Sequence, residues 1–136
     1  MLSRTEAAYL AGIIDGEGTI TLTKINRSEN RRPVISIAST DKELLIYIQQ
    51  LTGGYISSKK NYHPSFHKNS FSLIIKNKED IFYLLKSIIP YLRIPQKIKR
   101  ANLILHKYNI VTRRNGKYTP DALISKRQFE HDFFSS

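Results

Sequence analysis

The feature that most constrains the fold is a line of small residues on one predicted helix near the N-terminus. Ser3-Arg4-Thr5-Glu6 has the spacing of a capping box, which predicts that a helix begins there. Ala8, Gly12 and Gly16 then lie four residues apart on one face of that helix. Glycine inside a helix costs ~1 kcal/mol relative to alanine, so this face needs a compensating interaction. Small residues at this spacing let two helices approach closely, and we find no second such motif, so the natural partner is a second copy about a two-fold axis.

The elements expected after this helix indicate an α+β fold. Ile20 and Leu22 alternate with threonines, which predicts a strand, and a second strand over 34–39 completes a hairpin. The remaining expected elements are a helix over 41–51, strands over 55–60 and 70–75, a helix over 77–89, a helix from Pro95 to about 105, a loop over 109–120 and a short helix over 122–134. The order is αββαββα. We expect one domain over 1–136, with its core at about 3–107 and a C-terminal loop and helix at 108–136.

The charge balance indicates a polyanionic partner. The chain has 22 Lys and Arg against 11 Asp and Glu, a net charge of +11. A small chain this basic usually binds nucleic acid, with a membrane surface as the second candidate. No apolar run approaches ~18 residues, so we expect no membrane-spanning segment. The chain contains no cysteine, which excludes a disulfide framework and a thiolate zinc site.

Two acids occupy an unfavourable place at the end of the first helix. Asp15 and Glu17 lie at its C-terminal end, where the macrodipole disfavours negative charge by ~0.3–1 kcal/mol. Two copies of Glu17 that met across a dimer axis would also repel each other. A divalent cation removes both penalties, and hard carboxylate and carbonyl oxygens suit Mg²⁺.

The nine residues Leu10-Ala11-Gly12-Ile13-Ile14-Asp15-Gly16-Glu17-Gly18 resemble the signature of the LAGLIDADG homing endonuclease family. The resemblance covers about residues 5–107. It implies a four-stranded, saddle-shaped antiparallel sheet with the helices on one face. It also implies a homodimer, whose two sheets bind a long pseudo-palindromic double-stranded DNA site. It implies that Glu17 binds the metal with help from the carbonyl of Gly16, and that Asp15 is structural and caps the partner helix. The implied dimer interface is formed by Ala8, Gly12, Asp15 and Gly16.

The same resemblance implies the reaction and its cofactor. We expect Mg²⁺-dependent hydrolysis of one phosphodiester on each DNA strand, which promotes intron mobility. Mn²⁺ is expected to substitute, and Ca²⁺ to bind without supporting cleavage. An RNA maturase that binds its own intron RNA, or a DNA-binding protein that does not cut, are alternatives on the same fold. We expect an intracellular location, in an organelle (chloroplast or mitochondrion) or in a prokaryotic cytoplasm.

Two further residues are candidates for the catalytic machinery. Lys97 resembles an active-site lysine of homodimeric family members, where it would stabilise negative charge on the phosphate, and Lys99 is the rival. Asp41 falls where those relatives have a polar residue that organises solvent, and its alternative role is the N-cap of the following helix. The family's peripheral arginine falls on Leu45, an apolar residue.

One face of the predicted sheet is polar and basic. Hydroxyl, tyrosine, lysine and arginine side chains can reach base edges and phosphates, whereas the alternative is a merely solvated sheet face. The expected DNA-contacting residues are Thr19, Thr21, Thr23, Arg27, Arg32, Ser36, Tyr55, Ser57, Lys59, Ser70 and Ser72. His63 and His67 lie four apart, but Pro64 argues against a helix that presents both to a metal, so we expect no zinc site there.

Overall fold

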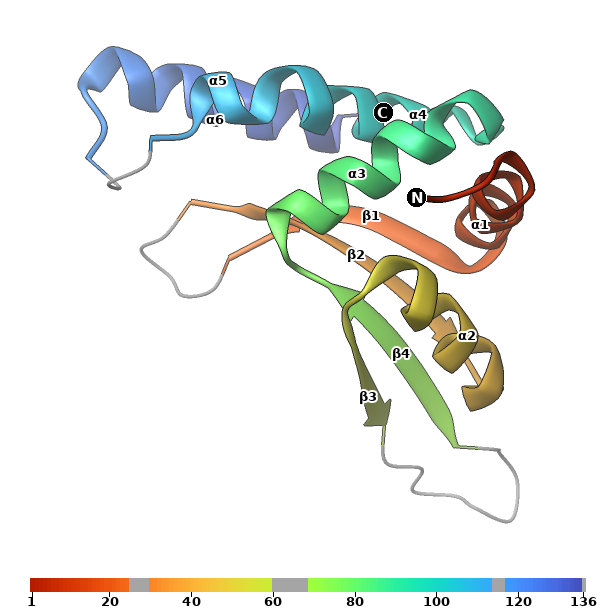
Figure 1. Cartoon of the computed structure of the whole chain (residues 1–136). Coiled ribbons are helices and arrows are strands. Elements are labelled where there is room, and N and C mark those ends of the chain that lie inside the picture. Colours follow the sequence, from red (N-terminus) through yellow and green to blue (C-terminus); the bar gives the residue numbers. More distant parts are fainter. Residues whose placement is uncertain (25–29, 60–68, 114–116, 136) are drawn as a thin grey trace.

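The computed structural model describes residues 1–24, 30–59, 69–113 and 117–135. It confirms the predicted order of helices and strands (Figure 1). The elements are α1 Arg4–Glu17, β1 Gly18–Thr23, β2 Arg32–Ser39, α2 Lys42–Thr52, β3 Tyr55–Lys59, β4 Ser70–Ile75, α3 Lys78–Ile88, η1 Ile89–Tyr91, α4 Pro95–Leu103, η2 Ile104–Tyr108, α5 Asn109–Val111 and α6 Pro120–Phe134. Arg27, His63 and His67 lie outside the described residues.

The four strands form one antiparallel sheet in the order β1-β2-β4-β3. The register places Thr19 opposite Ser36, Ser36 opposite Ile74, and Ile74 opposite Tyr55. Because side chains alternate along each strand, residues in such a row lie on the same face of the sheet. The structure therefore confirms the predicted α+β class with a four-stranded antiparallel sheet.

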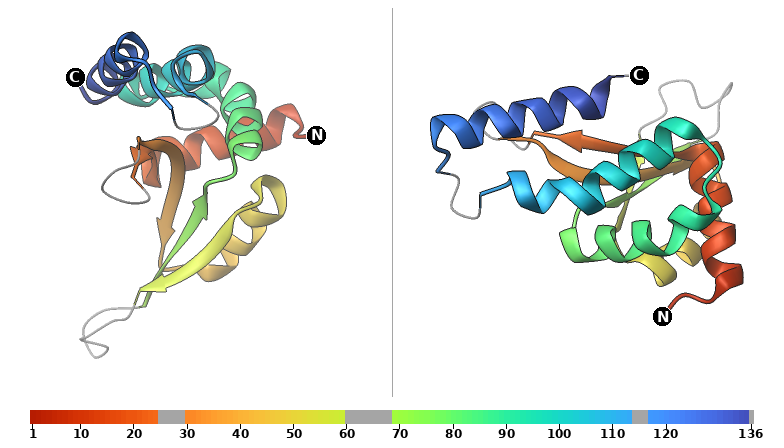
Figure 2. Two further views of the ribbon diagram at one scale, coloured as in Figure 1. Left: turned by 90° about the vertical axis from the view of Figure 1, so that its left-hand side faces the viewer. Right: turned by 90° about the horizontal axis from the view of Figure 1, so that it is seen from above.

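The helices cover one face of this sheet (Figures 1 and 2). Ile20, Ile35 and Leu73 point to that face and are at most 1% exposed. They pack against helix residues such as Leu10 and Leu85, which are fully buried. Burial of each such side chain stabilises the folded chain by ~1.5–3 kcal/mol. This apolar layer therefore determines which face of the sheet is turned away from the helices.

The first helix begins at a capping box and ends at a sharp junction with the first strand. The amide N–H of Glu6 donates to Ser3 Oγ at 3.1 Å, and Ser3 N–H donates to Glu6 Oε1 at 2.8 Å, so the predicted capping box is present. The helix ends at Glu17 and β1 begins at once with Gly18. A Cβ atom on Gly18 would lie 2.8 Å from Ile14 Cα, closer than packed atoms allow. Glycine is therefore required for the strand to turn away so close to the helix.

The C-terminal region is more helical, and more buried, than the sequence predicts. Helix α4 continues through η2, a wider π-helical turn, into α5, which occupies the start of the expected loop. Helix α6 lies beside this segment (Figure 2). Tyr108, Phe129 and Phe133 belong to the hydrophobic core, which thus extends past the expected boundary at residue 107. Among the described residues, no helix is both long enough and apolar enough to cross a membrane.

Candidate active site and nucleic-acid interface

Glu17 is exposed at the last position of α1 and borders a surface cleft of about 440 Å³. Ser39, Thr40 and Ser70 line the same cleft with their hydroxyl-bearing side chains, and its remaining walls are apolar. The sequence reasoning missed Ser39 and Thr40. The signal for them is their place at the end of β2, which pairs with the strand that directly follows Glu17. The cleft therefore combines one acid with several groups that bind water or phosphate.

Lys97 lies at the C-terminal end of α1. Its ammonium donates to the main-chain carbonyl oxygens of Ile14 at 2.6 Å and Asp15 at 2.7 Å. These carbonyls carry the negative end of the helix dipole, which a lysine stabilises. Its rival Lys99 points elsewhere and donates to the carbonyl oxygen of Ser135 at 2.6 Å. Of the two lysines, the structure thus places Lys97, which is distant in the chain, close in space to the turn that carries Glu17.

Asp15 is bound within its own chain. Its carboxylate accepts the amide N–H of Arg93 at 2.9 Å and of Ile94 at 3.2 Å. The resemblance implies a cap on the helix of a partner, which stays a prediction; within its own chain the acid binds the segment that leads into α4. Because α4 carries Lys97, the two contacts together fix that helix against the end of α1.

Asp41 is the N-cap of α2. Its Oδ1 accepts the amide N–H of Glu43 at 3.1 Å and of Leu44 at 3.3 Å. Asp41 does not line the cleft beside Glu17, where Ser39 and Thr40 lie instead. The structure thus shows the alternative role, N-capping, while the solvent-organising role stays a prediction. Leu45 is fully buried in the core, which excludes it from the peripheral role of an arginine.

One face of α1 presents small residues at the surface. Ala8, Gly12 and Gly16 are exposed. A Cβ atom built on Gly12 or Gly16 would meet no atom within 4 Å. Within the part of the chain that the structure describes, nothing therefore uses the close approach that these residues allow. Asp15 is partly buried and engaged with Arg93, which distinguishes it from the other three predicted interface residues.

The uncovered face of the sheet carries the predicted polar residues. Register and alternation place on it Thr19, Thr21, Thr23, Arg32, Ser36, Tyr55, Ser57, Ser70 and Ser72. Lys59 pairs with Ser70 at the end of β3. Val34 and Ile74 lie on the same face, so its centre is less polar than expected.

Two lysines that the sequence reasoning missed extend the basic character of this face. The ammonium of Lys76 lies 5.8 Å from the ring centroid of Tyr55. Lys24, Arg32 and Lys76 also surround a hollow of about 240 Å³ at one end of the sheet. The signal for Lys76 was the alternation that already gave Ser70 and Ser72, continued one residue past the end of β4.

The described residues do not form a complete metal site by themselves. Nowhere among them do three or more His, Cys, Asp or Glu side chains gather as a metal requires. Glu17 and the main-chain carbonyl of Gly16 supply hard oxygen donors of the type that Mg²⁺ prefers. The described residues thus fit a divalent ion only if further ligands come from outside them, such as a second copy or a phosphate.

Comparison with solved structures identifies the fold. The homing endonuclease I-CvuI in complex with its target superposes with a TM-score of 0.74 at 19% identity, covering 96% of this chain and 80% of that one. The archaeal intron-encoded homing endonuclease I-Vdi141I in complex with DNA gives a TM-score of 0.66 at 17% identity, covering 95% and 82%. The LAGLIDADG homing endonuclease I-GzeII with its DNA target gives 0.71 at 18% identity, and this chain covers 44% of it.

The sequence profile of the LAGLIDADG-like domain matches residues 4–88, more than half of the chain. The chain therefore belongs to the LAGLIDADG family, the family of homing endonucleases that its nine-residue motif predicted. A curated relative, an intron-encoded DNA endonuclease of Dictyostelium discoideum, is 27% identical over 107 residues, which are 79% of this chain. The chain spans only 40% of that relative's length.

Proposed function

We propose that the chain is a site-specific homing endonuclease that acts as a homodimer on double-stranded DNA and promotes intron mobility. The observation that carries this proposal is the arrangement at the end of α1, where exposed Glu17 lies between a face of small residues and the uncovered face of the sheet. The DNA complexes of the solved relatives and the intron-encoded curated relative support the same function.

The dimer follows from the exposed small residues of α1. Two helices that meet at Ala8, Gly12 and Gly16 can approach closely, because no side chain beyond a methyl group stands between them. Their C-terminal ends would then bring two Glu17 carboxylates near the axis, so that the second copy supplies a second acid at the site. Residues 1–136 would act as a single domain within each half of this dimer.

Each residue at the site has a separate role in phosphodiester hydrolysis. Glu17 and the carbonyl of Gly16 would hold Mg²⁺, with Mn²⁺ as a substitute and Ca²⁺ as an ion that would bind without supporting cleavage. When bound, the ion supplies Lewis-acid chemistry that activates water and stabilises the leaving oxygen. The two carbonyls at Lys97 take two of its three N–H donors, so one donor can serve a phosphate oxygen. Ser39 and Thr40 can orient water in the cleft beside Glu17.

The uncovered sheet face is the proposed DNA-reading surface. The β2 strand has 8 residues, which at ~3.3 Å each extend over ~26 Å, or roughly eight base pairs at ~3.4 Å. Two copies would thus read a long, pseudo-palindromic site. The hydroxyl groups would contact base edges, and Lys24, Arg32 and Lys76 would contact phosphates at one end of each sheet.

The substitution Glu17→Gln tests the reaction. A duplex selected from a randomised library by binding in Ca²⁺ would be placed in a supercoiled plasmid and incubated with the protein and Mg²⁺. We expect the wild type to linearise this plasmid, and Glu17→Gln to bind the duplex with wild-type affinity or better without nicking it. Glu79→Gln, which removes another exposed acid on α3, should cut normally.

Two results would contradict the proposal in different ways. Cleavage by Glu17→Gln would show that the metal acid lies elsewhere. A wild type that binds its selected duplex but never nicks it with Mg²⁺ or Mn²⁺ would indicate a DNA-binding protein without nuclease activity, and splicing assays on intron RNA would then test for a maturase.

A further inference from the structure

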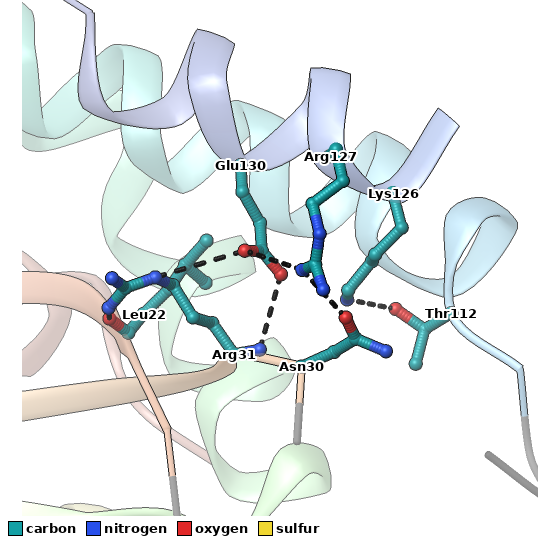
Figure 3. Close-up of polar contacts among 7 residues, drawn as sticks. All are labelled: Leu22, Asn30, Arg31, Thr112, Lys126, Arg127 and Glu130. Carbon is teal, nitrogen blue, oxygen red and sulfur yellow. Dashed lines mark hydrogen bonds and ion pairs between the residues drawn. The ribbon is translucent and has the colours of Figure 1, made fainter. Parts of the chain in front are cut away.

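Helix α6 binds the outer end of the β1–β2 hairpin (Figure 3). This helix lies beyond the family match at residues 4–88. The carboxylate of Glu130 accepts the amide N–H of Arg31 at 3.2 Å, and its other oxygen lies 3.8 Å from Arg31 Nε. Arg31 directly precedes β2. The start of β2 is therefore held by a side chain from a helix about one hundred residues further along the chain.

A second residue of α6 reaches the neighbouring position. Arg127 donates to the side-chain oxygen of Asn30 at 2.8 Å, and the same nitrogen lies 3.5 Å from Glu130 Oε1 (Figure 3). The residues of the hairpin that lead into β2 are thus bound at two consecutive positions. Both contacts come from one turn of α6, because residues three apart share a helix face.

The burial of this cluster makes the contact specific. Glu130 is only 7% exposed, and a carboxylate so buried requires paired partners. Lys126, one turn away, is fully buried, donates to Thr112 Oγ1 at 2.7 Å and lies 4.3 Å from the Tyr108 ring centroid. Burial lowers the pKa of Lys126 to about 8, although the charge of Glu130 opposes this shift. Helix α6 is therefore fixed on its inner side by the core, so that Glu130 is presented to the hairpin at a defined place.

Alternation along the start of β2 assigns Arg31 and Arg32 to opposite sides of the sheet. Arg31 lies on the α6 side, with its guanidinium 5.1 Å from the ring centroid of Phe134 and a hydrogen bond of 3.4 Å to the carbonyl of Leu22. Arg32 is the first residue of β2, pairs with Thr23 and belongs to the uncovered face. The side chain that Glu130 binds thus adjoins the outermost pair of residues on the proposed DNA-reading surface.

We propose that Glu130 is a positioning residue for DNA recognition: by holding Arg31, it sets the place of Arg32 and Thr23, and with it the base-pair preference at the outer end of each half-site. The proposal rests on the proposed DNA-binding function. Glu130 itself lies on the helix side of the sheet and is not expected to touch DNA.

Hydrogen exchange in the free protein tests the first half of the proposal without DNA. Glu130→Gln removes the charge but keeps an acceptor and nearly the same shape. We expect peptides that cover β1 and β2 to exchange faster in this variant, and peptides that cover β3 and β4 to exchange at the wild-type rate. The matched control is Asp132→Asn, since Asp132 lies on the same helix and its side chain bonds only Gln128 of that helix among the described contacts.

Base-pair preference tests the second half. Affinities would be measured for a selected duplex and for all its single base-pair substitutions. A mismatched base pair ordinarily lowers affinity by about fivefold or more. We expect this ratio to approach one in Glu130→Gln at the outer positions of each half-site and to stay at its wild-type value at the inner positions. Arg31→Met should give the same profile, and the double variant should lose no more preference than either single variant, because both residues act through one contact.

The outcomes separate this proposal from the function on which it rests. Unchanged exchange of β1 and β2 in Glu130→Gln, or an equal loss of preference at every base pair, would overturn the positioning role while DNA binding stands. If Glu130→Gln does not fold, Arg31→Met decides the same question from the half-exposed partner. A wild type that binds no duplex would overturn the proposed function and, with it, the recognition role of Glu130. Hydrogen exchange, which needs no DNA, would still show whether Glu130 holds β1 and β2.

Discussion

The ammonium of Lys97 lies 2.7 Å from the main-chain carbonyl oxygen of Asp15, while the carboxylate of Asp15 binds the amides of Arg93 and Ile94 just before the helix that carries Lys97. The side chain of each residue therefore binds the main chain at or near the other residue, and the two sets of bonds hold the end of α1 against the start of α4. The end of α1, with Gly16 and Glu17, is held on the α4 side by a cation and on the sheet side by the start of β1.

Substitution of Lys97 separates its capping role from its proposed catalytic role. Lys97→Met removes a charged donor to two carbonyls, which should lower the free energy of unfolding by ~1 kcal/mol or more. Loss of positive charge beside the phosphate should also lower the single-turnover cleavage rate by on the order of a hundredfold. Urea denaturation and cleavage at saturating protein measure the two effects. Lys99→Met is the matched control, and a stable Lys97→Met that cuts at the wild-type rate would restrict Lys97 to capping.

Substitution of Gly12 tests the dimer. No atom lies within 4 Å of a Cβ built on Gly12, so Gly12→Leu should fit the isolated chain. It should even stabilise α1 by roughly 0.5–1 kcal/mol, because glycine is a poor helix former. In a dimer built on this face, the leucine would keep the two helices apart. We expect light scattering to show a folded monomer without cleavage activity.

The control for Gly12→Leu is Ser125→Leu, a similar change at an exposed position of α6. A Gly12→Leu protein that remains a dimer and still cuts would refute the proposed interface. A wild type that is monomeric both free and on DNA would refute the two-fold arrangement as a whole.

The buried Lys126 should give the protein a stability that rises with pH in an alkaline window. Its pKa is lowered from 10.5 to about 8 by burial, so between these values the folded chain has released a proton that the unfolded chain still holds. The free energy of unfolding therefore increases from pH 8 toward pH 10. Burial raises the pKa of Tyr108, so above pH 10 the folded chain keeps a proton that the unfolded chain releases. This group therefore lowers the free energy of unfolding as the pH rises above 10.

The difference between wild type and Lys126→Met isolates this contribution. We expect the variant to lack the rise between pH 8 and 10 and to match or exceed the wild type in stability near pH 7, since an apolar side chain has no buried charge. Urea denaturation at a series of pH values measures both. Identical pH dependence in the two proteins would show that Lys126 keeps an ordinary pKa.

The sequence predicted the elements whose signals are local. The capping box at Ser3, the alternation around Ile20 and the motif that ends at Gly18 each depend on neighbours within a few residues, and the structure confirms the helix, the strand and the sharp junction between them. Charge and alternation also separated the two faces of the sheet before their register was known.

The roles that the sequence could not predict depend on distant partners. Asp15 and Asp41 are both acids at helix ends. The N-cap that Asp41 forms is local and was one of its two predicted roles, whereas the bonds of Asp15 to amides 78 and 79 residues away could not be predicted from spacing. Likewise, the spacing of Phe129 and Phe133 indicates a buried helix face but does not tell that Tyr108 packs against it. Nothing in the sequence distinguishes Glu130, because its partner Arg31 lies 99 residues away in the chain.

The close contact of Gly18 with Ile14 fixes the distance between the catalytic acid and the DNA-reading face of the proposed enzyme. Glu17 would define where the backbone is cut, and Thr19 is the first side chain of the reading face, only two residues later. Gly18, the residue between them, is packed against the helix. The number of base pairs between the cleaved phosphodiester and the first base that is read should therefore stay constant as the protein evolves. Substitutions on the strands can change which sequence is recognised, but every descendant of this chain should cut at the same distance from the bases it reads first.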